Sequence, residues 1–223
     1  LTEGEREKDF PAWSPDGKWL AYTCSFGANS WVAVQKPGEA PIRYQVGAGV
    51  HYRPRFTPDG RRLIAIFESP AHPADLWLLP LDGDQPIQLT HSLPPELAEA
   101  DFPLPEEILY PSLDGQLVPA LLFHQKDQTA PAPAVVLPHG GPNWLFQAIW
   151  YPVMCHMASR GWIVLAPNYR GSTGYGRSWQ IANRFDLGGI DAKDVAAGAE
   201  YLVHTGLADP DRIAITGRSH GGY

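Results

Sequence analysis

The sequence predicts a two-part protein, with the last blades of an antiparallel β repeat in residues 1–103 and the first part of a doubly wound, mostly parallel sheet with helices in residues 104–223. Three observations predict this architecture. A motif recurs within the first 90 residues, a proline-rich connector follows it, and buried apolar strands then alternate with helical stretches. With 44% apolar residues among 223, the chain can bury real cores.

The recurring motif is a hairpin with a Ser/Thr-Pro-Asp-Gly turn. Residues 12–22 read AWSPDGKWLAY, and 43 positions later residues 55–65 read RFTPDGRRLIA. Proline presets φ and glycine supplies the positive φ of such a turn. A tryptophan-containing strand and one further strand follow each copy, and about four strands per repeat is the period of a β-propeller blade. We therefore expect about two final blades of a longer propeller, with an ordinary β-sandwich as the alternative.

The second part begins beyond a connector at residues 92–105, which holds four prolines and shows no alternation. Continuous apolar runs indicate strands that are buried on both faces, as in parallel sheets covered by helices. Gly161 is a typical helix stop. The predicted strands are residues 107–110, 117–123, 134–137, 162–166 and 212–216, and the predicted helices are residues 144–160 and 191–205.

Residues 217–222 (GRSHGG) follow the last predicted strand and match the nucleophile-elbow pattern of α/β-hydrolases. In this pattern a serine occupies a strained strand-to-helix turn, so Ser219 is the candidate nucleophile. Residues 139–142 (HGGP) follow another strand about 80 positions earlier, where this fold places its oxyanion loop. The backbone N–H of His220, the residue after the nucleophile, is a candidate oxyanion donor.

Together with the two hairpins, HGGP and GRSHGG, residues 168–176 (NYRGSTGYG) and 209–213 (DPDRI) give five motifs in order. In these motifs the chain resembles the prolyl oligopeptidase family of serine peptidases, particularly its acylaminoacyl-peptidase and dipeptidyl-peptidase-like members. The resemblance implies a β-propeller before an α/β-hydrolase domain, and attack of Ser219 on a peptide carbonyl while the backbone amides of Gly141 and His220 hold the oxyanion. It also implies that the propeller restricts substrates to short peptides.

The order of catalytic residues along this fold is serine, aspartate, then histidine. Because nothing follows Tyr223, we expect the triad aspartate and histidine beyond it and residues 1–223 alone to be inactive. The start at Leu1 is likewise expected to be a truncated N-terminus. His139 and His220 flank the site, but we interpret them as a loop-positioning residue and a backbone donor rather than as the general base.

Three charged residues near the site have two interpretations each. Arg170 lies after a strand end, where ligands gather in parallel sheets, so it is a candidate substrate-binding residue; a guanidinium that ties down a glycine-rich loop is the alternative. Asp191 and Asp194 stand near a predicted helix start, where carboxylates suit the helix dipole. We expect helix capping there rather than catalysis.

Composition excludes several classes of function. A net charge of −7 argues against nucleic-acid and anionic-membrane partners, and no apolar run approaches the roughly 18 residues of a membrane span. No metal-ligand spacing is present, so neither metal nor cofactor is implied. Cys24 and Cys155 are expected to be buried free thiols, which favours a cytoplasmic location.

Two other functions remain open at this point. One is a carboxylesterase-like hydrolase on the same fold, although Pro142 stands where such enzymes often carry a third glycine. The other is a non-catalytic propeller binding module. The sequence determines neither the cleavage specificity, nor the number of propeller blades, nor the oligomeric state.

Overall fold

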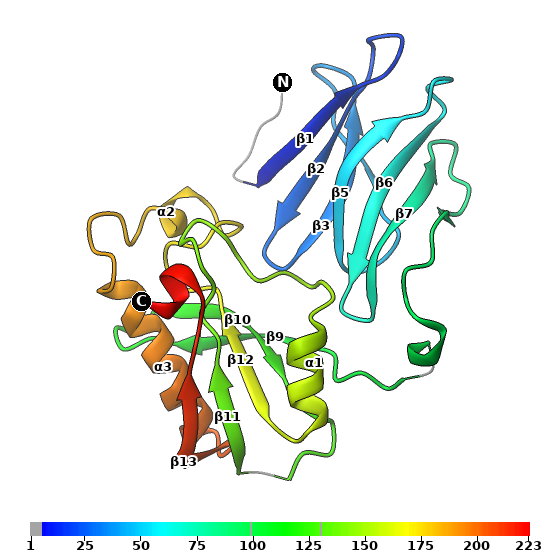
Figure 1. Ribbon diagram of the computed structural model, residues 1–223. Coiled ribbons are helices and arrows are strands. Elements are labelled where there is room, and N and C mark those ends of the chain that lie inside the picture. Colours follow the sequence, from blue (N-terminus) through cyan, green and yellow to red (C-terminus); the bar gives the residue numbers. More distant parts are fainter. Residues whose placement is uncertain (1–5, 99, 130) are drawn as a thin grey trace. The chain divides into compact units, whose positions relative to one another are not determined.

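The computed structural model of the protein describes residues 6–98, 100–129 and 131–223. It divides into two compact units (Figure 1), of which the first comprises Leu1–Ala100 with Gln147–Trp150, and the second Asp101–Phe146 with Tyr151–Tyr223. The main division thus falls after residue 100, where the sequence predicted one after residue 103. Residues 1–5, which carry the expectation of a truncated N-terminus, lie outside the described residues.

The first unit consists of two four-stranded antiparallel sheets, each with its strands in sequence order. The first sheet contains β1 (Glu7–Trp13), β2 (Leu20–Phe26), β3 (Asn29–Gln35) and β4 (Ile42–Tyr44). The second contains β5 (Val50–Phe56), β6 (Arg62–Ser69), β7 (His72–Pro80) and β8 (Ile87–Gln88). Each sheet has the four strands expected of one propeller blade.

The 43-residue period of the sequence recurs in the backbone geometry. Phe10 and Arg53 occupy equivalent positions, and both have positive φ, at 54° and 49°, within the irregular registers of β1–β2 and β5–β6. The turn glycines Gly17 and Gly60 have φ values of 69° and 68°. A β-bulge re-aims a strand at a fixed position. The two copies are therefore repeats of one structural unit as well as of one sequence.

His51 joins the two sheets of the first unit at their buried centre. Its Nδ1 lies 2.8 Å from the Ser30 carbonyl, and the Val46 N–H donates to its Nε2 at 2.9 Å. The Ser30 hydroxyl accepts from the His51 N–H, and the Thr23 hydroxyl donates to the His51 carbonyl. These contacts require a neutral ring with the proton on Nδ1. Burial lowers the pKa of His51 to about 4.

The second unit is built on a five-stranded mixed sheet in the order β13-β11-β12-β10-β9. Neighbours β11, β12 and β13 are parallel, and β9 and β10 form an antiparallel hairpin that pairs with β12. Tyr110, Leu165 and Leu202 lie fully buried in its core. The strands are β9 (Glu106–Pro111), β10 (Leu117–Phe123), β11 (Ala132–Val136), β12 (Ile163–Pro167) and β13 (Ala208–Ile215).

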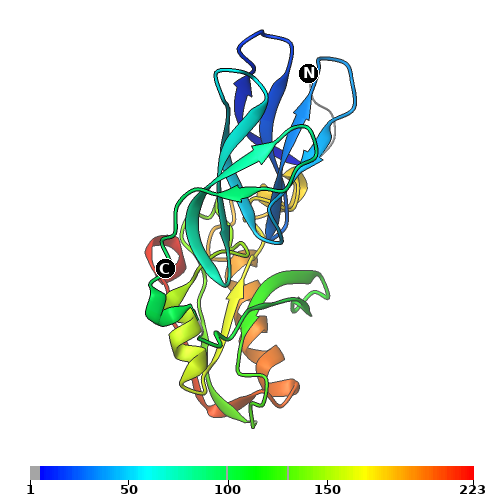
Figure 2. The same ribbon diagram turned by 90° about the vertical axis from the view of Figure 1, so that its right-hand side faces the viewer.

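Helices α1 (Pro152–Ser159) and α3 (Ile190–His204) lie on opposite faces of this sheet (Figure 2). The helix predicted over residues 144–160 begins only at Pro152, because a proline suits the first turn and not a helix interior. The predicted stop holds, since Gly161 has a φ of 82°. Three short helical segments complete the described elements: η1 (Pro95–Leu97), α2 (Arg177–Gln180) and η2 (Ser219–Gly222).

The exposure of the strands follows their place in the sheet. All five residues of β12 are buried, as expected for a central strand covered on both faces. Strand β13 stands at the sheet edge, and its Ile215 is 51% exposed. Cys24 and Cys155 are buried free thiols, as predicted. Among the described helices, none has the length and apolar character needed to span a membrane.

The His51 geometry predicts a pH dependence of folding. Below pH 6.5 the unfolded chain binds a proton that the folded ring resists until about pH 4, so the free energy of unfolding should fall across this window by about 3 kcal/mol. Replacing His51 by Gln should remove this part of the slope while the carboxylates keep theirs. Urea denaturation of both proteins at pH 7.5 and 4.5 measures the difference, and equal slopes would contradict the assignment.

Candidate active site

Ser219 stands where the sequence expects a nucleophile. Strand β13 ends at Ile215, and the short helix η2 begins at Ser219. The backbone of Ser219 has a φ of 57°, a left-handed conformation that is uncommon for a residue with a side chain. Such strain at a strand-to-helix turn is the geometry of a nucleophile elbow.

The glycines that flank Ser219 are required by close approach of the backbone. A Cβ on Gly217 would lie 2.5 Å from the carbonyl oxygen of Gly221. A Cβ on Gly221 would lie 2.1 Å from the carbonyl oxygen of Pro138. Both distances are too short for any side chain. The elbow therefore packs backbone to backbone against the start of the HGGP loop.

The HGGP loop reaches the nucleophile itself through Gly140. A Cβ on Gly140 would lie 3.3 Å from the Ser219 Cβ and 3.9 Å from its Oγ. The next residue, Gly141, has a φ of 134°, and a Cβ there would meet the Asn143 nitrogen at 2.7 Å. The structure thus brings the two predicted motifs together, with Gly141 one residue beyond the contact.

His139 lies beneath this loop and is almost fully buried, with 3% of its surface exposed. Its ring stacks on Tyr169 at a centroid distance of 4.4 Å, and its Nε2 lies 2.8 Å from the Ser172 hydroxyl. The Tyr169 hydroxyl also donates to the His139 carbonyl at 2.6 Å. Burial lowers the pKa of His139 to about 4, so the ring is neutral near pH 7. These contacts hold the loop and do not involve Ser219.

The side chain of His220 turns to the start of α3. Its Nε2 lies 2.9 Å from the Asp191 carboxylate, which is buried. Asp191 also accepts hydrogen bonds from the N–H groups of Gly188 and Ala192, as expected of an acidic residue at a helix start. None of the described histidine nitrogens contacts the Ser219 hydroxyl, because both histidines of the site are engaged elsewhere.

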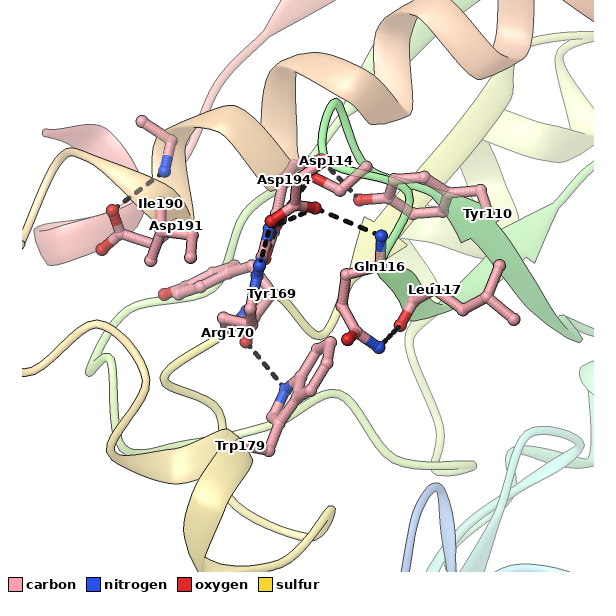
Figure 3. A network of polar contacts seen from close by, with 12 residues as sticks. Tyr110, Asp114, Gln116, Leu117, Tyr169, Arg170, Trp179, Ile190, Asp191 and Asp194 are labelled. Carbon is pink, nitrogen blue, oxygen red and sulfur yellow. Dashed lines mark hydrogen bonds and ion pairs between the residues drawn. The ribbon is translucent and has the colours of Figure 1, made fainter.

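Arg170 forms the centre of a buried polar network (Figure 3). Its guanidinium donates to both oxygens of Asp194, which is fully buried, and to the exposed carboxylate of Asp114 at 2.6 Å. The Ser112 hydroxyl donates to Asp194 and accepts from Arg170. A hydrogen bond from Arg170 lowers the pKa of Asp114, and the same network raises that of Arg170. These are the contacts of the loop-fixing alternative.

Asp194 therefore differs from the capping role expected of it. Its Oδ2 accepts from the Arg170 backbone N–H at 2.9 Å, and its backbone carbonyl accepts from the Tyr110 hydroxyl at 2.8 Å. It lies one turn inside α3, too far from the helix start to cap it. A carboxylate with two pairing partners distant in sequence carries no local signal that sequence reasoning could use.

Sequence reasoning also gave no role to Tyr169, Asn168 and Asn183. The Asn168 side chain is fully buried; it accepts from the Phe146 N–H at 2.6 Å and donates to the Phe146 carbonyl. Asn183 donates to Asp191 at 3.0 Å. The first two residues belong to the NYRGSTGYG motif, which was the available signal. They fix the loops that surround the elbow.

A cavity of about 600 Å³ lies beside the elbow within the second unit. Its lining includes Tyr169, Asp191, Gly217 and His220 but not Ser219, so it lies on the His220 side of the turn. Among the described residues, no three His, Cys, Asp or Glu side chains are grouped to hold a metal ion.

A serine at a strained turn after a parallel strand, packed on a glycine-rich loop, is typical of serine hydrolases. Residues 150–223 match the model of the prolyl oligopeptidase family. Peptidase YuxL of Bacillus subtilis, itself uncharacterized, is 33% identical over 170 residues, which are 75% of this chain and 26% of that protein. The acylamino-acid-releasing enzyme of Homo sapiens is 31% identical over 179 residues, 75% of this chain and 24% of that enzyme.

Solved structures agree with this result. The puromycin-hydrolyzing peptidase of Mycobacterium tuberculosis superposes with a TM-score of 0.85 at 27% identity, covering 100% of this chain and 37% of the peptidase. An acylaminoacyl peptidase in complex with Z-Gly-Gly-Phe-chloromethyl ketone gives 0.83 at 26% identity, covering 100% and 35%. The resemblance to the prolyl oligopeptidase family is therefore confirmed. This chain spans about a quarter of the length of the two curated relatives.

The network around Arg170 predicts a large effect on stability. Replacing Arg170 by Met leaves the buried carboxylate of Asp194 without its charged partner, which should cost about 3–5 kcal/mol of unfolding free energy. Replacing the exposed partner in Asp114→Asn should cost less than about 1 kcal/mol. Chemical denaturation of both variants measures this contrast. Unchanged stability of Arg170→Met with a raised KM would instead support substrate binding.

Proposed function

We propose that this chain is part of a serine-type peptidase that hydrolyses short peptides through an acyl-enzyme on Ser219. The observation that carries the proposal is the contact between the strained elbow and the HGGP loop, where Gly140 lies directly against Ser219. This contact leaves room for a substrate carbonyl between a nucleophile and backbone donors. The kinship with peptidases of the prolyl oligopeptidase family supports a peptide substrate.

In this mechanism the Ser219 oxygen attacks the carbonyl carbon of the scissile peptide bond. The backbone N–H groups of Gly141 and His220 stabilise the oxyanion of the tetrahedral intermediate. Collapse of this intermediate expels the amine and leaves an ester on Ser219, which water then hydrolyses. Neither step requires a side chain from the Arg170 network, whose part is to fix the neighbouring loop.

The general base is proposed to be a histidine outside residues 1–223, oriented by an aspartate that also lies outside them. Two observations support this assignment. His139 Nε2 is engaged with Ser172, and His220 Nε2 is engaged with Asp191, so neither ring is aimed at the nucleophile. A serine hydroxyl without a base is a weak nucleophile. Residues 1–223 alone are therefore expected to be inactive.

The two units are assigned accordingly. We take residues 1–103 as the last two blades and connector of a β-propeller, and residues 104–223 as the first part of an α/β-hydrolase domain. Two four-stranded sheets in sequence order support the first assignment. Parallel strands with helices on both faces and an elbow after a strand support the second. A propeller in front of the site would admit short peptides and exclude folded proteins.

The test uses the full-length protein that contains this chain, with Ser219→Ala as its control. We expect turnover of peptide anilides that falls at least about 10³-fold in the control, because the nucleophile is lost. The measurement is kcat/KM for a set of peptide anilides and for a matched ester. Residues 1–223, purified alone, should give no turnover.

Other outcomes distinguish the competing functions. Turnover of the ester without turnover of any peptide would contradict the proposal and favour a carboxylesterase-like enzyme. No turnover of either substrate would favour a non-catalytic propeller binding module. Turnover by residues 1–223 at the rate of the full-length protein would contradict the assignment of the base.

A further inference from the structure

Asp191 is the meeting point of three segments of the second unit. Its Oδ1 accepts from the N–H groups of Gly188 at 2.8 Å and Ala192 at 2.9 Å. Its Oδ2 accepts from the Asn183 amide at 3.0 Å and lies 2.9 Å from the Nε2 of His220. Only 3% of its surface is exposed. Four partners on one buried carboxylate leave it a single orientation.

Only part of this arrangement is explained by helix capping. The two backbone contacts made by Oδ1 satisfy N–H groups at the start of α3, as a capping carboxylate does. The two contacts made by Oδ2 reach side chains from elsewhere in the chain. One of these, His220, follows the nucleophile directly and lies 29 positions away from Asp191. The Oδ2 contacts therefore connect the helix to the elbow.

His220 is held at both ends of its residue. Its backbone belongs to η2, where an early N–H has no acceptor within the helix and stays available as a donor. Its imidazole is fixed by Asp191, and its side chain is 15% exposed. Because the ring cannot move without breaking a charge-assisted hydrogen bond, the direction of the backbone N–H is constrained as well.

The chain of contacts continues to the loop after β12. The Asn183 side chain is 2% exposed and occupies the space next to Gly171, where a Cβ would lie 2.3 Å from the Asn183 Nδ2. Asn183 thus packs against the loop that carries Arg170 while donating to Asp191. The elbow, the start of α3 and the loop after β12 are tied through one carboxylate.

We propose that the Asp191 carboxylate and the His220 side chain are positioning residues that aim the His220 backbone N–H at the developing oxyanion. This inference rests on the proposed function, because it assigns the pair a part in the same site. Neither side chain touches the reacting atoms. Preorganised donors act only when they are aimed at the place where charge develops, and a small misplacement lowers the rate.

The experiment compares variants of the full-length protein. His220→Ala and Asp191→Asn keep every backbone N–H and should lower kcat about 10- to 100-fold while KM changes less than about threefold. His220→Gln should restore much of the rate, because its amide can donate to Asp191. Since the pair acts as a unit, the double variant should lose no more than the worse single variant.

A transition-state mimic separates positioning from general damage to the fold. The affinity of a peptide boronate, which places a negative oxygen in the oxyanion hole, should fall in parallel with kcat across the variants. Asp186→Asn is the matched control, because it removes an exposed carboxylate from the same helix start without contact to His220. This control should keep the wild-type kcat and boronate affinity.

The outcomes distinguish this inference from the proposed function. Wild-type turnover that Ser219→Ala abolishes but Asp191→Asn and His220→Ala leave unchanged would overturn the inference alone. Equal losses in kcat with unchanged boronate affinity would also overturn it, because the oxyanion donor would then be intact. A wild-type protein inactive on peptide and ester would overturn both proposals.

Discussion

The close approach of two backbone segments governs this site. The elbow and the HGGP loop touch where Gly217, Gly221 and Gly140 leave no room for a Cβ. The left-handed backbone of Ser219 is tolerated because the surrounding contacts determine it. A nucleophile and a loop rich in backbone donors therefore face each other before any substrate arrives, which is the condition for electrostatic preorganisation.

Two acidic residues of α3 give this contact its setting. Asp191 and Asp194 are one helical turn apart and both are buried, but they bind in different directions. Asp191 holds the elbow through His220, and Asp194 holds the loop after β12 through Arg170. Unpaired, either charge would be costly in the interior. The helix thus fixes two loops at the carboxyl ends of neighbouring strands.

The local features of the fold could be predicted from the sequence. Turn chemistry and apolar alternation located the strands of both repeats, and the elbow pattern located Ser219 after β13. The start of α1 could not be found in the same way. The stretch before Pro152 has no strong helix breaker, and Gln147–Trp150 pack with the first unit, so distant contacts decide its conformation.

The polar contacts of the site were also beyond prediction. Asp194 and Arg170 are 24 positions apart, and nothing in either local sequence names the other as a partner. The residues were visible as candidates, and their pairing was not. Whether Gly141 and His220 hold an oxyanion stays a prediction, because geometry without a substrate leaves it open to experiment.

The central claim is that Ser219 is an activated nucleophile in the full-length protein. Labelling with a fluorophosphonate, followed by mass spectrometry of the digested protein, tests it most directly, because the reagent forms a covalent bond only with an activated serine. The account predicts a single adduct on the peptide that contains Ser219, and no adduct in Ser219→Ala. An unlabelled Ser219, or labelling of another serine with the same loss of activity, would contradict it.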